Sequence, residues 1–134
     1  MLIIDAFRTT IASALLARID TGTTNPSAII EFYTGAMPAA MGGTITATKL
    51  GTLTCANPSG TVANGVLTFA AIAQDDAADA EGIAGWARVL DRDGAEVLYL
   101  SVGATGSNAD IEMLSTSVVA GGPLRITSAV ITVQ

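Results

Sequence analysis

The hydrophobic pattern of the first part of the chain has a helical period. Apolar side chains recur at i, i+4, i+7 and i+8 from Phe7 to Leu15, which predicts a helix from Asp5 to about Ile19 with Asp5 as its N-cap. The predicted helical face consists of Phe7, Ile11, Ala14, Leu15 and Arg18. Gly22 ends this N-terminal helical segment, residues 1–22. Because the apolar stripe is narrow, we expect the helix to lie on a sheet or on another subunit.

From residue 28 the pattern changes to a period of two, which predicts a β core over residues 28–134. In the run Ala28–Thr34, Ile30 and Phe32 share one face, and Glu31 and Tyr33 lie on the other. Further strands are expected within residues 44–56, 66–72, 86–90, 97–100, 111–113, 115–119 and 124–133. Short connections between strands are typical of a sandwich or barrel. We therefore predict a single mainly β domain, residues 1–134: an antiparallel, jelly-roll-like β-sandwich of about eight strands with one N-terminal α-helix.

The clearest turn signal lies between the apolar runs Trp86–Leu90 and Val97–Leu100. Asp93-Gly94 predicts a tight two-residue turn there, because Gly accepts the positive φ that such a turn needs. This hairpin carries the only Trp and the bulkiest local side chains, so we expect it to nucleate the core. Asn64-Gly65 predicts a second hairpin.

The segment Gly35–Gly43 is apolar, but Pro and Gly interrupt it too often for a strand or helix. An apolar loop of this kind is a candidate contact arm. Together with the helix it supplies the candidate interface residues, which are Phe7, Ile11, Leu15, Met37, Pro38 and Met41.

The composition is unusually apolar. Hydrophobic residues make up 50% of the 134 residues and charged residues only 13%, against about 25% charged in a typical domain. No run reaches the ~18 apolar residues of a membrane helix, so the surplus favours subunit contacts and a homo-oligomer. The net charge of -6 gives no cationic surface for nucleic acid, and we expect neither a nucleic-acid nor a membrane partner. The N-terminus lacks the cationic region of a signal peptide, so we expect an unprocessed chain made in the cytoplasm.

Most routes to catalysis lack their parts. The chain has no His and a single Cys, so a Ser-His-Asp or Cys-His site and a His/Cys zinc site are excluded, as is a disulfide framework. Cys55 is expected to be a buried, inert thiol. Lys49 is the only Lys and follows no P-loop pattern. Paired carboxylates exist, but a carbohydrate cleft would add stacking aromatics, which make up only 4% of the chain. We expect no enzyme and no catalytic, metal or cofactor-binding residues.

Acidic residues gather in the second half of the chain, with nine of the twelve between Asp75 and Glu112. A calcium loop and a solvated acidic loop are the two interpretations of Asp75–Glu81 and of Asp91-x-Asp93-Gly94. Neither stretch has the full spacing of calcium ligands with a closing Glu, which favours solvated loops and turns.

Five ordered segments resemble a family of small proteins from tailed bacteriophages and prophages, and the similarity covers nearly the whole chain. The segments are Glu31-Phe-Tyr-Thr-Gly35, Leu50-Gly-Thr-Leu-Thr-Cys55, Gly65-Val-Leu-Thr-Phe-Ala-Ala-Ile72, Gly85-Trp-Ala-Arg-Val89 and Ala120-Gly-Gly-Pro-Leu-Arg-Ile-Thr-Ser128. Such proteins typically belong to the virion's structural module, and some similar ones are jelly-roll cement proteins on capsids. The family has no catalytic residues to carry over.

The resemblance implies a virion structural protein made in the host bacterial cytoplasm, foremost a capsid decoration or cement protein on the capsid surface that binds the major capsid protein. A homotrimer is implied in the same way, because cement proteins often sit at threefold sites. A neck or tail component is the alternative within this class. A glycan-binding surface module is the alternative from another class, and it would depend on Trp86 or Tyr33.

Overall fold

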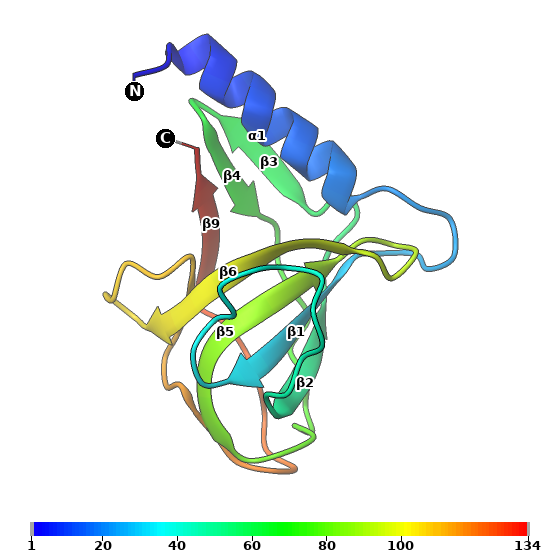
Figure 1. Cartoon of the computed structure of the whole chain (residues 1–134), viewed down its shortest axis with the longest axis vertical. Helices are drawn as coiled ribbons and strands as arrows, with labels where there is room; N and C mark the ends of the chain where they lie inside the picture. Colours follow the sequence, from blue (N-terminus) through cyan, green and yellow to red (C-terminus); the bar gives the residue numbers. More distant parts are fainter. Residues whose placement is uncertain (1, 134) are drawn as a thin grey trace.

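The computed structural model describes residues 2–133, which form one helix and a curled sheet (Figure 1). The elements are α1 (Asp5–Ile19), β1 (Ile29–Thr34), β2 (Lys49–Thr54), β3 (Gly60–Ala63), β4 (Val66–Phe69), β5 (Gly82–Leu90), β6 (Glu96–Ala104), β7 (Ile111–Met113), β8 (Ser117–Val118) and β9 (Ser128–Thr132). The strand order is β2-β1-β5-β6-β7-β9-β4-β3, and β8 pairs with β5. The chain is thus mainly β with one N-terminal helix, as predicted.

The prediction of a purely antiparallel sheet is wrong. β6 and β7 run parallel, with Val102, Gly103 and Ala104 opposite Ile111, Glu112 and Met113, while the other strand pairs of the described chain are antiparallel. A parallel pair needs a connection that returns the chain to its starting end, and residues 105–110 provide it. Turn signals in the sequence mark such a connection but do not give the direction of the next strand.

The helix has the predicted bounds, but its N-cap and its buried face differ from the prediction. Ile4 is the N-cap and has no side-chain cap hydrogen bond, while Asp5 lies in the first turn and pairs with Arg8. The buried helical residues are Ala12 and Ile19, with Leu15 and Leu16 partly buried against the core. This face rests on β3 and β4 (Figure 1). Small Ala12 allows the close approach, whereas Phe7 and Ile11 of the predicted face stay exposed.

Both faces of β1 are buried. Ile30 and Phe32 are fully buried and point into the core, as predicted. Glu31 and Tyr33 on the opposite face are only 8% and 5% exposed. The main core lies between the two halves of the curled sheet and includes Ile30, Phe32, Leu50, Leu53, Leu67, Ala87, Val89, Leu100, Ile111, Leu124 and Ala129.

The central hairpin forms, but its turn is longer than predicted. Residues 91–95 connect β5 to β6, closed by the hydrogen bond from the Asp91 N–H to the Ala95 carbonyl, with Gly94 at φ 84°. A bulge between Val89 and Leu90 shifts the register next to this turn. The Asn64-Gly65 turn between β3 and β4 is the predicted two-residue hairpin turn, with φ of 52° and 78°.

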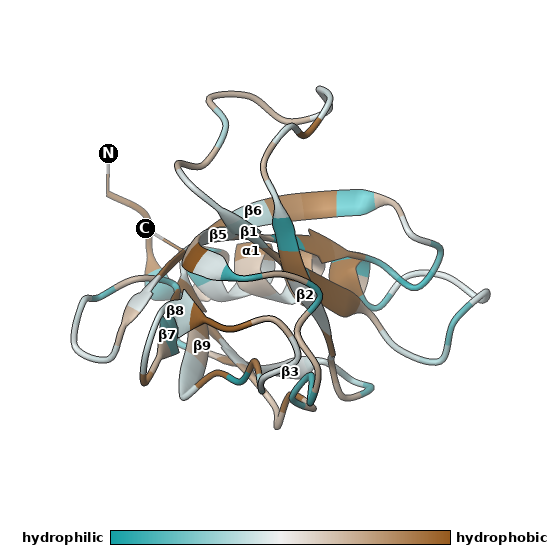
Figure 2. Cartoon of the chain, turned by 90° about the horizontal axis from the view of Figure 1, so that it is seen from below, coloured by the Kyte–Doolittle hydropathy of each residue, from teal (hydrophilic) through white to brown (hydrophobic). Residues whose placement is uncertain are grey.

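Several strands are shorter than the sequence pattern. The runs predicted over 44–56, 66–72 and 124–133 pair only over residues 49–54, 66–69 and 128–132. Residues 35–48 rise from the outer face of the sheet and arch over it (Figure 2), and we call this segment the arm. Within residues 2–133, the helix is neither long nor apolar enough to cross a membrane.

Candidate functional site

The outer face of the sheet, opposite the main core, carries a cluster of ionic and aromatic side chains. It consists of Glu31, Tyr33, Trp86, Arg88, Glu96 and Tyr99, which come from β1, β5 and β6. Antiparallel register brings them together, because Glu31 lies opposite Arg88 and Tyr33 lies opposite Trp86. We call this group the outer cluster.

Arg88 connects the two carboxylates of the outer cluster. Its Nη2 lies 2.6 Å from Glu31 Oε1, and its Nη1 lies 3.1 Å from Glu96 Oε2. Lys49 adds a longer contact, 3.6 Å from Glu31 Oε2. Tyr33 donates a hydrogen bond to Glu31, and Tyr99 donates one to Glu96. Each buried charge therefore has a partner of opposite charge and further hydrogen bonds.

The pKa values follow from these contacts. Burial alone would lower the pKa of Arg88, but its hydrogen bonds to Glu31 and Glu96 raise it above its usual range. The hydrogen bond from Tyr99 lowers the pKa of Glu96, and the same bond raises the pKa of Tyr99. Burial, and then the hydrogen bond to Glu31, raises the pKa of Tyr33. These shifts favour the charged forms of Arg88 and Glu96 and the neutral forms of Tyr33 and Tyr99, and the ion pairs of Arg88 link β1, β5 and β6.

Trp86 forms the aromatic half of the outer cluster. Its ring stacks on Tyr33 with the centroids 4.6 Å apart and contacts Tyr99 in a tilted arrangement at 4.8 Å. The indole N–H donates to the Thr34 carbonyl over 3.3 Å, and the side chain is fully buried. Trp86 lies outside the main core, on the other face of the same sheet, because the face with Ala87 and Val89 points into that core. Nothing in the structure tests the prediction that the hairpin nucleates the core.

The arm leaves the sheet beside this cluster. At its base, Gly85 approaches Gly35 so closely that a Cβ on Gly85 would lie 1.9 Å from the Gly35 carbonyl oxygen. Further along, the Gly42 N–H donates to Glu96 Oε1 over 3.2 Å. The arm is therefore tied to the outer cluster by backbone contacts, while the side chains of its tip stay outside.

The structure places the six candidate interface residues on two surfaces. Phe7 and Ile11 are 53% and 37% exposed on α1. Met37 and Met41 are 39% and 46% exposed on the arm, where Pro38 is exposed as well. Leu15 turns inward and packs against the core. The helix and the arm are thus separate surfaces, and Leu15 supports the fold.

Other apolar side chains are exposed that the sequence did not predict as interface residues. Ile83, Leu114 and Val119 are 60%, 75% and 67% exposed near the pairing of β5 with β8, and Ile4 is 73% exposed before α1. In addition, β6 pairs with β5 from Glu96 to Ser101 but with β7 only at Val102–Ala104, so no strand within residues 2–133 covers its other edge from Glu96 to Leu100. A free strand edge is a template for pairing with another chain.

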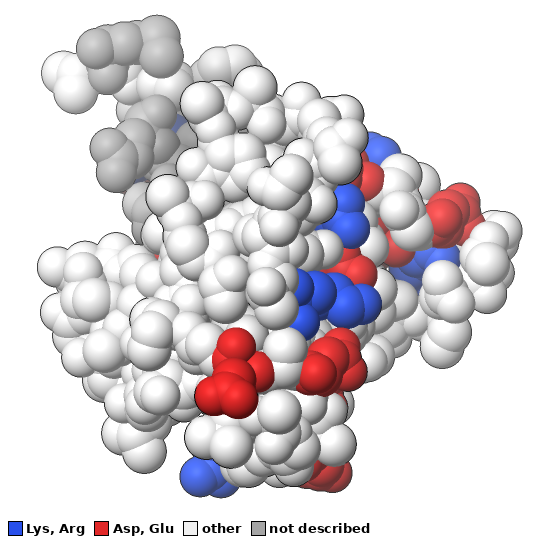
Figure 3. Space-filling model, turned by 60° about the horizontal axis from the view of Figure 1, so that its bottom comes forward, with Lys and Arg blue, Asp and Glu red and all other residues white. Residues whose placement is uncertain are grey.

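The acidic residues serve mainly as turn caps. Asp91 accepts the N–H groups of Asp93 and Ala95 and binds Arg18, while Asp93 accepts the N–H groups of Thr23 and Thr24. In the described part of the chain, no three or more of these carboxylates gather where they could hold a metal ion. Figure 3 shows basic and acidic side chains lying next to one another on one face, surrounded by uncharged surface.

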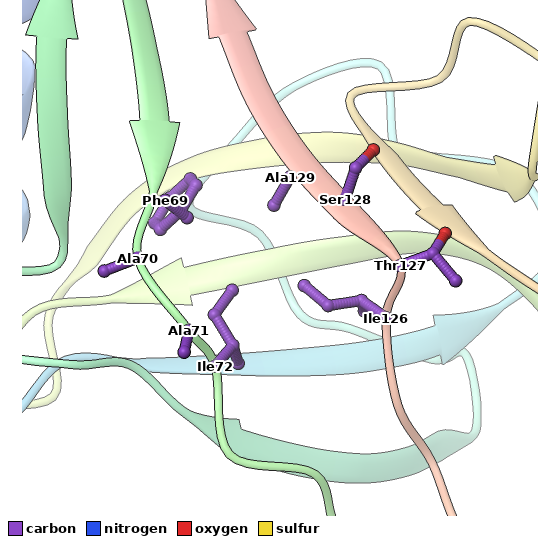
Figure 4. Close-up of a pocket in the computed structure, with 8 residues that line it drawn as sticks. All are labelled: Phe69, Ala70, Ala71, Ile72, Ile126, Thr127, Ser128 and Ala129. Atoms are coloured by element: carbon purple, nitrogen blue, oxygen red, sulfur yellow. The ribbon is translucent and has the colours of Figure 1, made fainter.

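A buried thiol and a groove without ionisable groups are two further features of the structure. Cys55 is buried, as predicted, and burial raises the pKa of its thiol to about 12. A groove of about 280 Å³ opens where the chain after β4 diverges from the start of β9. Figure 4 shows Ile72 and Ile126 across it from one another, with no ionisable group among the lining residues. It has room for a small apolar side chain.

Comparison with known proteins gives no relative: no family model, no curated protein sequence and no solved structure matches this chain.

Proposed function

We propose that the chain is a non-enzymatic structural protein of a bacteriophage virion, foremost a capsid decoration or cement protein that binds coat subunits. The observation that carries this proposal is the distribution of side chains. The buried ionisable groups of the outer cluster pair with one another, whereas large apolar side chains are exposed on α1, on the arm and beside β8. A surface of this kind is suited to protein contacts. The resemblance to small tailed-phage proteins supplies the class of partner.

The free edge of β6 supports the same proposal. An edge that lacks Lys, Pro and a covering strand can accept an extended segment of a coat subunit by strand addition. The arm rises from the same sheet and carries Met37 and Met41, whose flexible side chains adapt to a partner surface.

We also propose that the sheet forms a jelly-roll-like sandwich. A jelly-roll-like sandwich would place β2-β1-β5-β6 and β7-β9-β4-β3 in two layers. In its favour, the main core combines Ile30, Leu53 and Val89 from the first group with Leu67, Ile111 and Ala129 from the second. The parallel contact between β6 and β7 is a departure from that pattern.

The proposal includes a position on the particle. The chain would be made in the host cytoplasm, associate with itself, and sit as trimers at threefold sites on the capsid surface. Few charges are available for these contacts, since only 13% of residues are charged, so binding should weaken only modestly with added salt. Dominant ionic contacts would instead give release of the chain at about 0.5 M salt, several times the physiological ionic strength.

Mass spectrometry and cryo-electron microscopy of purified parent particles test the proposal. We expect the chain in stoichiometric amounts and density for it outside the coat. Density at the neck or tail would favour the alternative position within the same class, and absence of the chain from particles would overturn the structural role.

The glycan-binding alternative needs an exposed aromatic face. Trp86 is fully buried and Tyr33 is 5% exposed, so neither offers one in this structure. Specific retention on a glycan array, lost in Trp86→Ala, would nevertheless favour that function over the proposed one.

A further inference from the structure

The helix α1 has an apolar stripe that the fold does not use. Its inner face, with Ala12, Leu16 and Ile19, packs on the sheet. Ile4, Phe7 and Ile11 are 73%, 53% and 37% exposed, and Ala14 is exposed as well. Phe7, Ile11 and Ala14 follow one another at intervals of four and three residues, which is the spacing of a helix–helix seam, and Ile4 lies just before them as the N-cap.

The stripe points sideways from the body of the protein. At 3.6 residues per turn, its mean direction lies roughly a third of a turn round the helix from the inner face. Arg18 continues the stripe by one more interval, is 46% exposed, and binds Asp91 in the turn after β5. A neighbouring helix could therefore lie beside α1 without displacing the contacts that hold α1 on the sheet.

The order of side chains along the stripe is complementary to its own reverse. In an antiparallel pair centred on Ile11, large Phe7 of one copy lies opposite small Ala14 of the other. The end with Asp5, which is 70% exposed and pairs with Arg8, then lies beside the end with Arg18, which is 46% exposed and pairs with Asp91, and the two helix dipoles oppose each other favourably. A parallel arrangement would place Phe7 on Phe7, Ala14 on Ala14, and Arg18 on Arg18.

We propose that α1 is a self-association surface, on which a second copy of this chain binds through an antiparallel helix pair with Ile11 on the twofold axis. The inference rests on the self-association included in the proposed function, and it identifies α1 as the surface through which two copies bind. It concerns the free chain, in which a twofold pair replaces the threefold arrangement that a coat lattice would impose. A helix of 15 residues is only ~22 Å long, so the pair buries less than the roughly 800 Å² per partner of a standard interface and dissociates on dilution.

Sedimentation velocity on the purified full chain over a range of concentrations tests the contact. We expect a monomer–dimer equilibrium, with Ile11→Asp weakening association at least tenfold, because a charge at the centre of the seam is left without a partner. Ser13→Asp is the matched control, since it adds the same charge to an exposed position outside the stripe. Circular dichroism should show both variants folded. A monomer at all concentrations, or equal effects of the two variants, would overturn the proposal.

Disulfide cross-linking tests the direction of the pair. In a Cys55→Ala background, chains with Phe7→Cys are mixed with chains with Ala14→Cys and oxidised. The antiparallel pair predicts the mixed 7–14 product, whereas a parallel dimer or trimer predicts 7–7 and 14–14 products. Finding the latter would refute the antiparallel pair. Because these experiments use no particles, their failure leaves the presence of the chain in virions as a separate question.

Discussion

The indole ring of Trp86 stacks on the phenol ring of Tyr33, with the ring planes inclined by 16° and the centroids 4.6 Å apart. This pair lies on the opposite side of the sheet from the main core, where Tyr99 and the base of the arm complete its enclosure. The sheet is therefore buried on both faces in this region, and the outer cluster is a second, smaller packing centre.

Replacing Trp86 by Ala should destabilise the protein by about 3–5 kcal/mol, the usual cost of removing a large buried aromatic side chain. The measurement is urea denaturation followed by far-UV circular dichroism. Leu114→Ala is the control, because Leu114 is 75% exposed and its loss should change stability by no more than about 0.5 kcal/mol. Similar costs for the two variants would contradict the packing role of Trp86.

The sequence could predict those features that depend on local periodicity. The bounds of α1, the inward face of Ile30 and Phe32, and the Asn64-Gly65 turn each follow from neighbouring residues and were confirmed. The location of Trp86 could not be predicted in this way, because alternation separates two faces without saying which one meets the core when both are covered.

Long-range packing explains the other differences. The inner face of α1 is centred on Ala12, whose small side chain lets the helix pack closely on β3 and β4. A prediction from hydrophobicity alone instead favours burial of the larger Phe7 and Ile11. The parallel pairing of β6 with β7 depends on where residues 105–110 return the chain. The outer cluster joins Glu31 to Arg88 across 57 positions, and only strand order brings them together.

Gly85→Ala tests the attachment of the arm. The added Cβ would lie 1.9 Å from the Gly35 carbonyl oxygen, so either the arm base or β5 must move. We expect destabilisation by about 1–3 kcal/mol and a red shift of Trp86 fluorescence as water reaches the ring. Gly43→Ala is the matched control, because a Cβ there meets nothing within 4 Å. An unshifted spectrum in Gly85→Ala would show that the arm base does not enclose Trp86.

Acid should weaken the tie between α1 and the central hairpin. Burial alone would raise the pKa of Asp91, but hydrogen bonds from Arg18, Ala95 and Asp93 lower it. A carboxyl whose pKa is lower in the folded state contributes stability above its unfolded value of about 3.9 and loses it as the pH falls through the folded value. Asp91→Asn should therefore cost about 2 kcal/mol at pH 7, and this cost should become smaller as the pH falls below about 3.9.

Denaturant midpoints at several pH values measure this difference. Asp76→Asn serves as the control, since Asp76 lies in an exposed loop and receives a hydrogen bond only from nearby Gln74. A constant difference between Asp91→Asn and the parent chain from pH 7 to pH 3 would contradict the ionic explanation.

Alkali should act through the buried thiol of Cys55. Burial raises the pKa of Cys55 to about 12, from an ordinary value of about 9 in the unfolded chain. Stability from the protonated thiol is fully present below pH 9 and is lost as the pH rises towards 12, because only the unfolded state releases the proton in that interval. The slope due to one such proton is at most about 1.36 kcal/mol per pH unit.

Tyr33 and Tyr99 also have raised pKa values, and their unfolded forms ionise near pH 10, so between pH 9 and 10 they add the same slope to the parent chain and to Cys55→Ala. In that interval we expect the free energy of unfolding to fall more steeply with pH for the parent chain than for Cys55→Ala, and the difference between the two slopes is the contribution of the thiol. The folded parent should also react slowly with an aromatic disulfide reagent at pH 8, and rapidly once denaturant unfolds it, since the thiolate is the reacting form. Parallel pH profiles for the two chains, or fast reaction in the folded state, would mean that Cys55 is open to solvent.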